Sequence, residues 1–310
     1  MKKVFIFFLV FFAISSLIGY FLFGGFGKYA GPVYQGSLID AHNHPPVDPP
    51  SPDIMRKQLD DAGINKIVLF NNRKVLDLYK ALTDRIIPFY YPEKSYETPD
   101  QLSAPLATFE EALQKGYLGI GEVSLRHEPP FETNVPADSD NVKKIIDLAV
   151  KYDIPINIHQ DSHFDELERL LSYNPKAKII LAHTGEGISL STFWRVKTLL
   201  DKYPNLSMDL STLTRSYHHF DAKQLNRTDT SGLPIPVYLT KVNGEINPLW
   251  KYLLEKYADR LMIGGDDYIY DVDNLKTEAD SFRVILGQIN QDAAEKIAYK
   301  NILRLLTKSK

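Results

Sequence analysis

The sequence of 310 residues contains no cysteine. This absence excludes disulfide bonds and thiolate metal ligands, so any metal ion must be held by nitrogen and oxygen atoms. It also excludes a lipid-modified cysteine as a means of attachment to a membrane.

The sequence also lacks an excess of charge of one sign. Lysine and arginine together number 36, against 39 aspartates and glutamates, which gives a formal net charge of −3. This balance predicts no general attraction to nucleic acid or to anionic lipid. We therefore expect no nucleic-acid partner.

Several common catalytic and binding motifs are missing. A dinucleotide-binding fingerprint would need a third glycine where Ser124 follows Gly119 and Gly121. The sequence has no glycine-rich phosphate loop and no His-Glu-X-X-His helix. Residues 187–191 miss the nucleophile-elbow pattern at its last position.

A long apolar run stands at the N-terminus. Lys2 and Lys3 precede uncharged residues from Val4 to Phe26. A secretory signal core has about 7–15 residues and a spanning helix needs roughly 20, so the length favours a transmembrane anchor over residues 1–27 rather than a cleaved signal peptide. The two lysines should stay in the cytoplasm. The remainder would then be extracytoplasmic, in the periplasm or at the cell surface, or secreted if the N-terminus is cleaved.

After this run, apolar stretches of strand character alternate with longer amphipathic stretches. The predicted strands are residues 37–41, 66–70, 85–90, 117–123, 154–158, 177–182, 206–210 and 261–264. The predicted helices are residues 52–62, 75–82, 107–115, 142–152, 164–171, 192–203, 248–257, 275–289 and 293–306. Apolar strands separated by helices indicate a parallel sheet, and eight such units close into a (β/α)8 TIM barrel, here residues 37–308. An open, doubly wound sheet is the alternative.

Barrel enzymes place their chemistry at the C-terminal ends of the strands. The residues of metal-ligating or acid–base type at predicted strand ends are His42, His44, Glu122, His159, His183 and Asp266. Each alone has a structural explanation: a histidine pair in a turn before Pro45, a buried core histidine, an ion pair of Glu122 with Arg126, or a turn cap. Together they come from five different strands and predict one metal centre.

This set of motifs resembles the amidohydrolase superfamily of metal-dependent barrel hydrolases. The matching residues are His42-Asn43-His44 on strand one, Glu122 on strand four, His159 on strand five, His183 on strand six and Asp266 on strand eight. The run around Glu122 is similar to the TatD-like branch, and the Gly-Gly-Asp ending at Asp266 to the amidohydrolase-related branch. A TatD-like nuclease is disfavoured because the mouth region has no basic, aromatic-rich surface.

The resemblance implies how the ligands are divided. His42, His44 and Asp266 would hold a first divalent ion, most simply zinc, with Glu122 bridging to a second ion held by His159 and His183. With one ion, His159 would join the first site and His183 would orient substrate or water. Asp267 competes with Asp266 for the strand-eight role.

The resemblance also implies the chemistry. A divalent ion lowers the pKa of bound water from ~15.7 toward ~7, and Asp266 would take the proton and pass it to the leaving group. The expected activity is hydrolysis of an amide, ester or related bond in a small-molecule substrate. The alternatives are a decarboxylase or lactonase of the same fold, and a catalytically silent binding barrel.

Three residues are candidates for substrate binding. Arg126 follows strand four and could meet an anionic group, although a surface ion pair is an equal alternative. His218 and His219 lie in the long polar stretch of residues 212–247, which could act as a lid over the mouth. The sequence indicates no oligomeric state.

Overall fold

The computed structural model describes residues 29–45, 50–71, 74–91, 105–127, 133–185, 189–213, 237–241, 243–268 and 272–308. Eight parallel strands in this part of the chain follow the order β1-β3-β4-β5-β7-β8-β9-β10. Their bounds are β1 Ile39–Asp40, β3 Lys66–Asn71, β4 Ile86–Tyr90, β5 Gly119–His127, β7 Pro155–Gln160, β8 Lys178–Leu181, β9 Leu206–Asp209 and β10 Leu261–Met262. Each strand neighbours the next one along the chain, which is the order of a barrel. The predicted (β/α)8 fold is confirmed.

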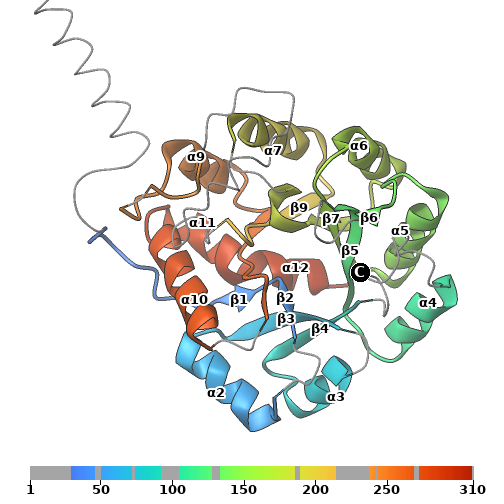
Figure 1. The fold of residues 1–310 in the computed structure, drawn as a ribbon, viewed down its shortest axis with the longest axis horizontal. Coiled ribbons are helices and arrows are strands. Elements are labelled where there is room, and N and C mark those ends of the chain that lie inside the picture. Colours follow the sequence, from blue (N-terminus) through green and yellow to red (C-terminus); the bar gives the residue numbers. More distant parts are fainter. Residues whose placement is uncertain are drawn as a thin grey trace, which may run out of the picture.

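A ring of helices covers the outside of the strands (Figure 1). These helices are α2 Pro52–Ala62, α3 Lys74–Ala81, α4 Leu106–Gln114, α5 Asp140–Tyr152, α6 Phe164–Tyr173, α7 Leu190–Lys202, α9 Pro248–Lys256 and α10 Val272–Leu286. The bounds of α2 illustrate the local rules: the Ser51 side chain accepts the N–H of Ile54, and Gly63 ends the helix in the left-handed region at φ 67°.

The barrel closes between its last and first strands mainly at the C-terminal end. There β11 (Asp267–Tyr268) runs parallel to β2 (Asn43–His44), and the Asp266 N–H donates to the His42 carbonyl at 2.8 Å. Below this pair, the Ala41 N–H donates to the Ile263 carbonyl at 3.0 Å. The seam therefore brings the strand-eight aspartate beside the strand-one histidines.

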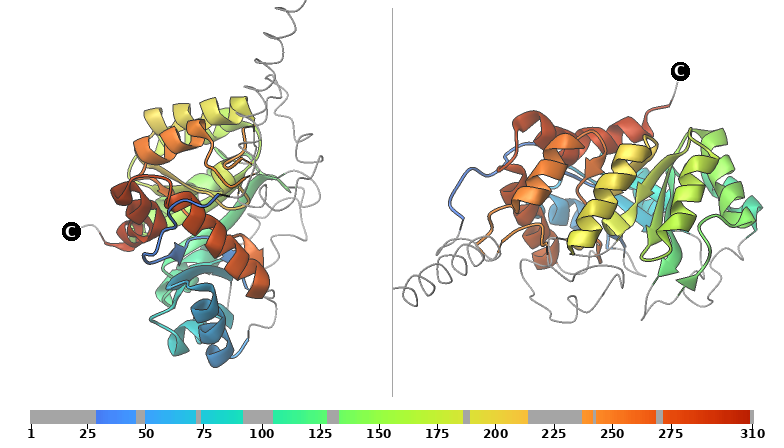
Figure 2. Two further views of the ribbon diagram at one scale, coloured as in Figure 1. Left: turned by 90° about the vertical axis from the view of Figure 1, so that its left-hand side faces the viewer. Right: turned by 90° about the horizontal axis from the view of Figure 1, so that it is seen from above.

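The C-terminal helices fill the opposite end of the barrel (Figures 1 and 2). The predicted helix of residues 293–306 is instead three pieces: α11 Gln291–Glu295, a π-helical turn Lys296–Lys300 and α12 Asn301–Leu306. Within the turn, the Ile297 carbonyl accepts a hydrogen bond from the N–H of Ile263. This N–H lies just beyond the end of β10 and is not bonded to a neighbouring strand. Ile302 and Leu305 of α12 belong to the same buried cluster as the barrel interior. The irregular helix thus seals the gap left by the short β10 strand.

The observed strand bounds differ from the predicted ones by one or two residues at most ends, and two predicted strands differ more. The strand of residues 117–123 continues as β5 to His127, because its end pairs with the antiparallel β6, Thr133–Asn134. The first strand is interrupted after Asp40 and resumes as β2. Both changes occur at the C-terminal end, where the candidate residues lie.

No helix of the described residues is both long and apolar enough to cross a bilayer. The anchor predicted at residues 1–27 lies outside those residues, and so does most of the predicted lid, residues 214–236.

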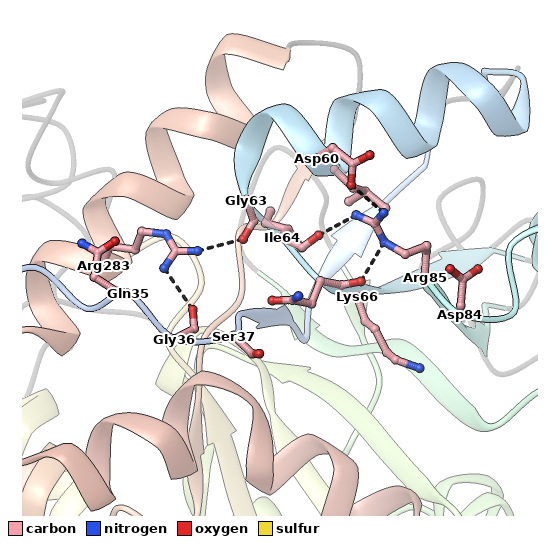
Figure 3. Close-up of a pocket in the computed structure, with 12 residues that line it drawn as sticks. Gln35, Gly36, Ser37, Asp60, Gly63, Ile64, Lys66, Asp84, Arg85 and Arg283 are labelled. Atoms are coloured by element: carbon pink, nitrogen blue, oxygen red, sulfur yellow. Dashed lines mark hydrogen bonds and ion pairs between the residues drawn. The ribbon is translucent and has the colours of Figure 1, made fainter.

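A pocket of about 590 Å³ lies at the N-terminal ends of β1, β3 and β4, away from the candidate residues (Figure 3). Arg283 of α10 bridges its walls: the guanidinium donates to the carbonyls of Tyr34 and Gly36 at 3.0 Å and to that of Gly63 at 2.8 Å. The chain leading into β1 is fixed by these bonds to α2 and α10. We therefore interpret the pocket as a structural contact between α2, α10 and the segment before β1 rather than as a catalytic site.

Replacing Arg283 with alanine should lower the free energy of unfolding by about 2 kcal/mol, because three carbonyls lose a charged donor. The exposed bidentate ion pair of Arg56 with Asp84 is the matched control. Arg56→Ala should cost less than about 1 kcal/mol. Urea unfolding of both variants measures the difference, and equal losses would contradict a bridging role for Arg283.

Candidate metal centre

Glu122 lies at the middle of the candidate residues, and its two carboxylate oxygens face different histidines. Oε2 is 3.2 Å from Nε2 of His44 and 3.7 Å from Nε2 of His42. Oε1 is 2.8 Å from Nδ1 of His159 and 3.2 Å from Nε2 of His183. One carboxylate therefore joins a His42–His44 pair to a His159–His183 pair.

Asp266 completes the first group of ligand atoms. Its Oδ1 is 3.4 Å from Nε2 of His42 and 3.6 Å from Nε2 of His44. A tetrahedral ion with ligands at ~2.1 Å separates neighbouring ligand atoms by roughly 3.4 Å. The distances of 3.2–3.7 Å from the Nε2 atoms of His42 and His44 to the Glu122 and Asp266 carboxylates match the spacing in such a coordination shell.

Two glycines allow this close approach of strand eight to strand one. A Cβ atom on Gly264 would lie 2.8 Å from Cβ of His42, and one on Gly265 would lie 2.9 Å from Oδ2 of Asp40. Asp266 follows them in the left-handed region at φ 55°, which aspartate tolerates better than most residues. The Gly-Gly-Asp sequence therefore fits the turn that presents the carboxylate.

The group is buried on one side and open on the other. The side chains of His42, His159 and His183 are at most 3% exposed, whereas those of His44 and Asp266 are 12% and 21% exposed. A substrate coming from solvent would therefore meet His44 and Asp266 first.

Asp209, at the end of β9, is a buried member of the site that sequence reasoning missed. Its Oδ2 accepts from Nδ1 of His42 and from the amide of Asn157, each at 3.0 Å. The available signal was a carboxylate inside the apolar stretch Leu206–Leu210, the same signal that singled out Glu122.

Asp161 is a second residue that sequence reasoning missed. Its Oδ1 lies 2.6 Å from Nε2 of His159, behind the ring nitrogen that faces Glu122. The His127 ring stacks on that of His159, with 3.9 Å between the ring centroids. His159 is thus held from behind by a carboxylate and an aromatic ring.

Burial and charge act in opposite directions on these groups. Burial would raise the pKa of Glu122, but the charges of His42 and His159 and hydrogen bonds from His159 and His183 hold it well below its ordinary value. Burial would likewise raise the pKa of Asp266, but contact with His42 and the charges of His183 and His42 lower it. Both groups are therefore carboxylates at neutral pH.

The histidines show the complementary shift. Burial lowers the pKa of His42, but the charges of Asp209 and Glu122 outweigh it and raise the pKa well above its ordinary value. In His159 burial is outweighed in the same way by Asp161 and Glu122. Without another cation, the carboxylates retain protons on these imidazoles.

The residues present fit a divalent ion. The buried Nε2 atom of His42 has no hydrogen-bond partner among the described residues, although it faces the carboxylates of Glu122 and Asp266. Among the described residues, four groups of three side chains each have possible ligand atoms within 4.8 Å of one another: His42, His44 and Glu122; Glu122, His159 and His183; His42, His183 and Asp209; and His127, His159 and Asp161. Imidazole nitrogens and carboxylate oxygens are ligands that zinc and manganese accept.

The candidates for substrate binding fare differently. Arg126 forms a bidentate ion pair with Glu166, with N–O distances of 3.0 Å and 2.6 Å. This is the ion-pair alternative to substrate binding, but the partner is Glu166 rather than Glu122. His218 and His219 lie outside the described residues. Asp267 lies in β11, paired with Asn43, whereas Asp266 reaches the histidines.

Comparison with known families shows the family to which this chain belongs. The sequence profile described as amidohydrolase matches residues 39–308. The chain belongs to the amidohydrolase family. Its predicted resemblance is confirmed, and family membership indicates an amidohydrolase-like enzyme rather than a silent binding barrel. Comparison with curated proteins gives no significant match.

Solved structures with the same fold include three instructive relatives. A probable 2-pyrone-4,6-dicarboxylic acid hydrolase from Acinetobacter baumannii is 15% identical, with 87% of this chain and 99% of that chain covered and a TM-score of 0.58. An amidohydrolase from Burkholderia multivorans with bound zinc is 13% identical, with 88% and 100% covered and a TM-score of 0.57. A dihydroxybenzoic acid decarboxylase from Polaromonas sp. JS666 with bound manganese is 15% identical, with 88% and 97% covered and a TM-score of 0.54.

The raised pKa values of His42 and His159 predict the pH dependence of the metal-free amidohydrolase. A group whose pKa is raised by folding stabilises the fold below its unfolded pKa, ~6.5 for histidine, and the contribution is lost as pH rises through the folded pKa. With a chelator present, the free energy of unfolding should therefore fall from pH 7 to pH 9. Each pKa unit crossed corresponds to about 1.4 kcal/mol.

Urea unfolding at a series of pH values tests this expectation. Glu122→Gln is the matched variant, because it keeps the size of the side chain but removes the shared negative charge. Its stability should depend less on pH over the same range. A metal-free protein whose stability rises from pH 7 to pH 9 would contradict the assignment.

Proposed function

We propose that this amidohydrolase is a metal-dependent hydrolase that adds water across an amide, ester or related bond of a small-molecule substrate. His42, His44, Glu122 and Asp266 would hold a first divalent ion, most simply zinc. Glu122, His159 and His183 would hold a second ion if two are bound. The supporting observation is the spacing of 3.2–3.7 Å between the facing atoms of the first group.

A divalent ion held there supplies Lewis acidity, which polarises a substrate oxygen and makes water more acidic. Asp266 is the group suited to move the proton, because its pKa is low and its side chain is the most exposed of the set at 21%. It would accept a proton from the attacking water at Oδ2 or Oδ1 and give it to the leaving group. The buried side of the site, formed by His42, His159 and His183, excludes solvent behind the substrate.

Decarboxylation is the second candidate reaction. It is supported by the fold shared with decarboxylases, among them the manganese-containing enzyme acting on dihydroxybenzoic acid and a 2,6-dihydroxybenzoate decarboxylase. Hydrolysis is favoured by the position of Asp266, a carboxylate at the open side that can carry a proton from water to a leaving group. The two reactions differ in product, because decarboxylation releases carbon dioxide without adding water.

Elemental analysis and a substrate panel test this proposal. The purified protein should contain one or two divalent ions per chain, and a chelator should abolish an activity that zinc or manganese restores. The panel comprises esters, amides, lactones and aromatic carboxylates. Release of carbon dioxide from a carboxylate, with no hydrolysis of the other compounds, would replace the hydrolase proposal with the decarboxylase one.

Asp266→Asn is the informative variant within that panel. It keeps an oxygen ligand but cannot carry the proton, so kcat should fall by about 10²–10⁴ with a smaller change in metal content. Asp84→Asn, at an exposed ion pair far from the site, serves as the control and should leave kcat unchanged. A kcat for Asp266→Asn close to that of the unmodified enzyme would exclude Asp266 as the proton carrier.

We also propose that residues 1–27 anchor the enzyme in a membrane with its barrel outside the cytoplasm. The apolar run from Val4 to Phe26 supports this. Cell fractionation should find the full chain in the membrane, and protease added to intact spheroplasts should digest the barrel. A barrel protected from protease until the spheroplasts are lysed would refute the topology.

A further inference from the structure

Asp209 is a buried carboxylate that accepts five hydrogen bonds. Oδ2 accepts from Nδ1 of His42 and from the Asn157 amide, each at 3.0 Å. Oδ1 accepts from the backbone N–H groups of His183 at 3.0 Å and Ser211 at 3.3 Å, and from the Ser211 hydroxyl. The side chain has no exposed surface. A carboxylate offers about four lone-pair positions and no donor, so these five bonds use its whole accepting capacity.

This arrangement sets the position of the proton on His42. Asp209 accepts, so Nδ1 of His42 must carry the hydrogen. When His42 is neutral, its lone pair is then on Nε2, the buried atom that faces Glu122 and Asp266. The orientation of the ring and its tautomer are both fixed from behind.

Ser211 extends the same control to His183. Its hydroxyl hydrogen is donated to Asp209, so its oxygen is left to accept from Nδ1 of His183 at 2.7 Å. The lone pair of a neutral His183 is then on Nε2, which lies 3.2 Å from Oε1 of Glu122. Two acceptors at that distance require a proton or a cation between them.

Asp209 is poorly suited to bind the ion itself. An ion bound between Asp209 and His42 would have to be held by Nδ1 of His42, but that nitrogen is hydrogen-bonded to Asp209. The other nitrogen, Nε2, faces the other candidate ligands. The five donors leave Asp209 no free lone pair.

We propose that Asp209 is a positioning residue that prepares His42, and through Ser211 also His183, to present unprotonated Nε2 atoms to a divalent ion. This inference rests on the proposed metal-dependent function. Contacts of this kind raise the basicity of a ligating imidazole, and losing one typically weakens metal affinity by 10–100-fold.

Asp209→Asn tests the role with little change in shape. In either orientation the new amide NH₂ group faces at least two of the existing donors, so the bond to His42 or the bonds to His183 and Ser211 are lost. Zinc affinity of the full chain, measured by competition with a chromophoric chelator, should fall by about 10–100-fold. The visible absorption of the Co²⁺-substituted protein should change as well, because a ligating imidazole is displaced.

Ser207→Ala is the matched control. Ser207 is a buried residue two positions before Asp209 on the same strand, so it lies on the same face of β9. Its zinc affinity and Co²⁺ spectrum should equal those of the unmodified chain. A merely structural role for Asp209 would lower thermal stability in Asp209→Asn and leave both metal readouts unchanged.

Ser211→Ala keeps the test decisive if Asp209→Asn does not fold. It leaves Asp209 and its bond to His42 in place but removes the acceptor for Nδ1 of His183, together with one of the five donors to Asp209, so a several-fold loss of zinc affinity is expected. Unchanged zinc affinity in whichever of these variants folds would overturn the positioning role. Failure of the unmodified chain to bind zinc, manganese or cobalt would instead overturn the proposed function.

Discussion

The structure of the site depends on the placement of one carboxylate, Glu122, between two pairs of imidazoles. A buried carboxylate is costly to desolvate unless positive charge lies beside it. Among the described contacts of Glu122 and Asp209, the partners are imidazoles, hydroxyl and amide groups, with no lysine or arginine. Either protons on the histidines or a metal ion must therefore balance the charge, and a metal ion does so while leaving the imidazoles neutral.

The same strand pairing that closes the barrel also brings the residues of the site together. The seam between β10 and β1 has few strand contacts of its own, and β11 pairing with β2 completes it at the C-terminal end. That pairing places the Asp266 backbone against His42. The π-helical turn and α12 seal the other end with Ile302 and Leu305. The candidate ligands contributed by the first and last strands consequently meet only in the complete barrel.

Much of the fold and many of the candidate site residues could be predicted, because the ends of the strands can be recognised in the sequence. Apolar stretches ending in histidine or acid marked His159, His183 and Glu122, and the barrel order carried them to one rim. The same reading passed over Asp209, although it is, like Glu122, a carboxylate inside an apolar strand. It also offered Glu122 as a partner for Arg126, which pairs instead with Glu166 of α6.

The sequence by itself determined the parallel alternation of strands and helices, the exclusion of thiolate ligands and most of the side chains that are candidates to bind a metal ion. Those properties follow from local periodicity and from residue chemistry. Only the tertiary structure decided which oxygen of Glu122 faces which histidine, and which residue stands behind each ring. Such assignments depend on distances between strands far apart in the chain, and a spacing of 3 Å between two side chains is set by packing rather than by local sequence.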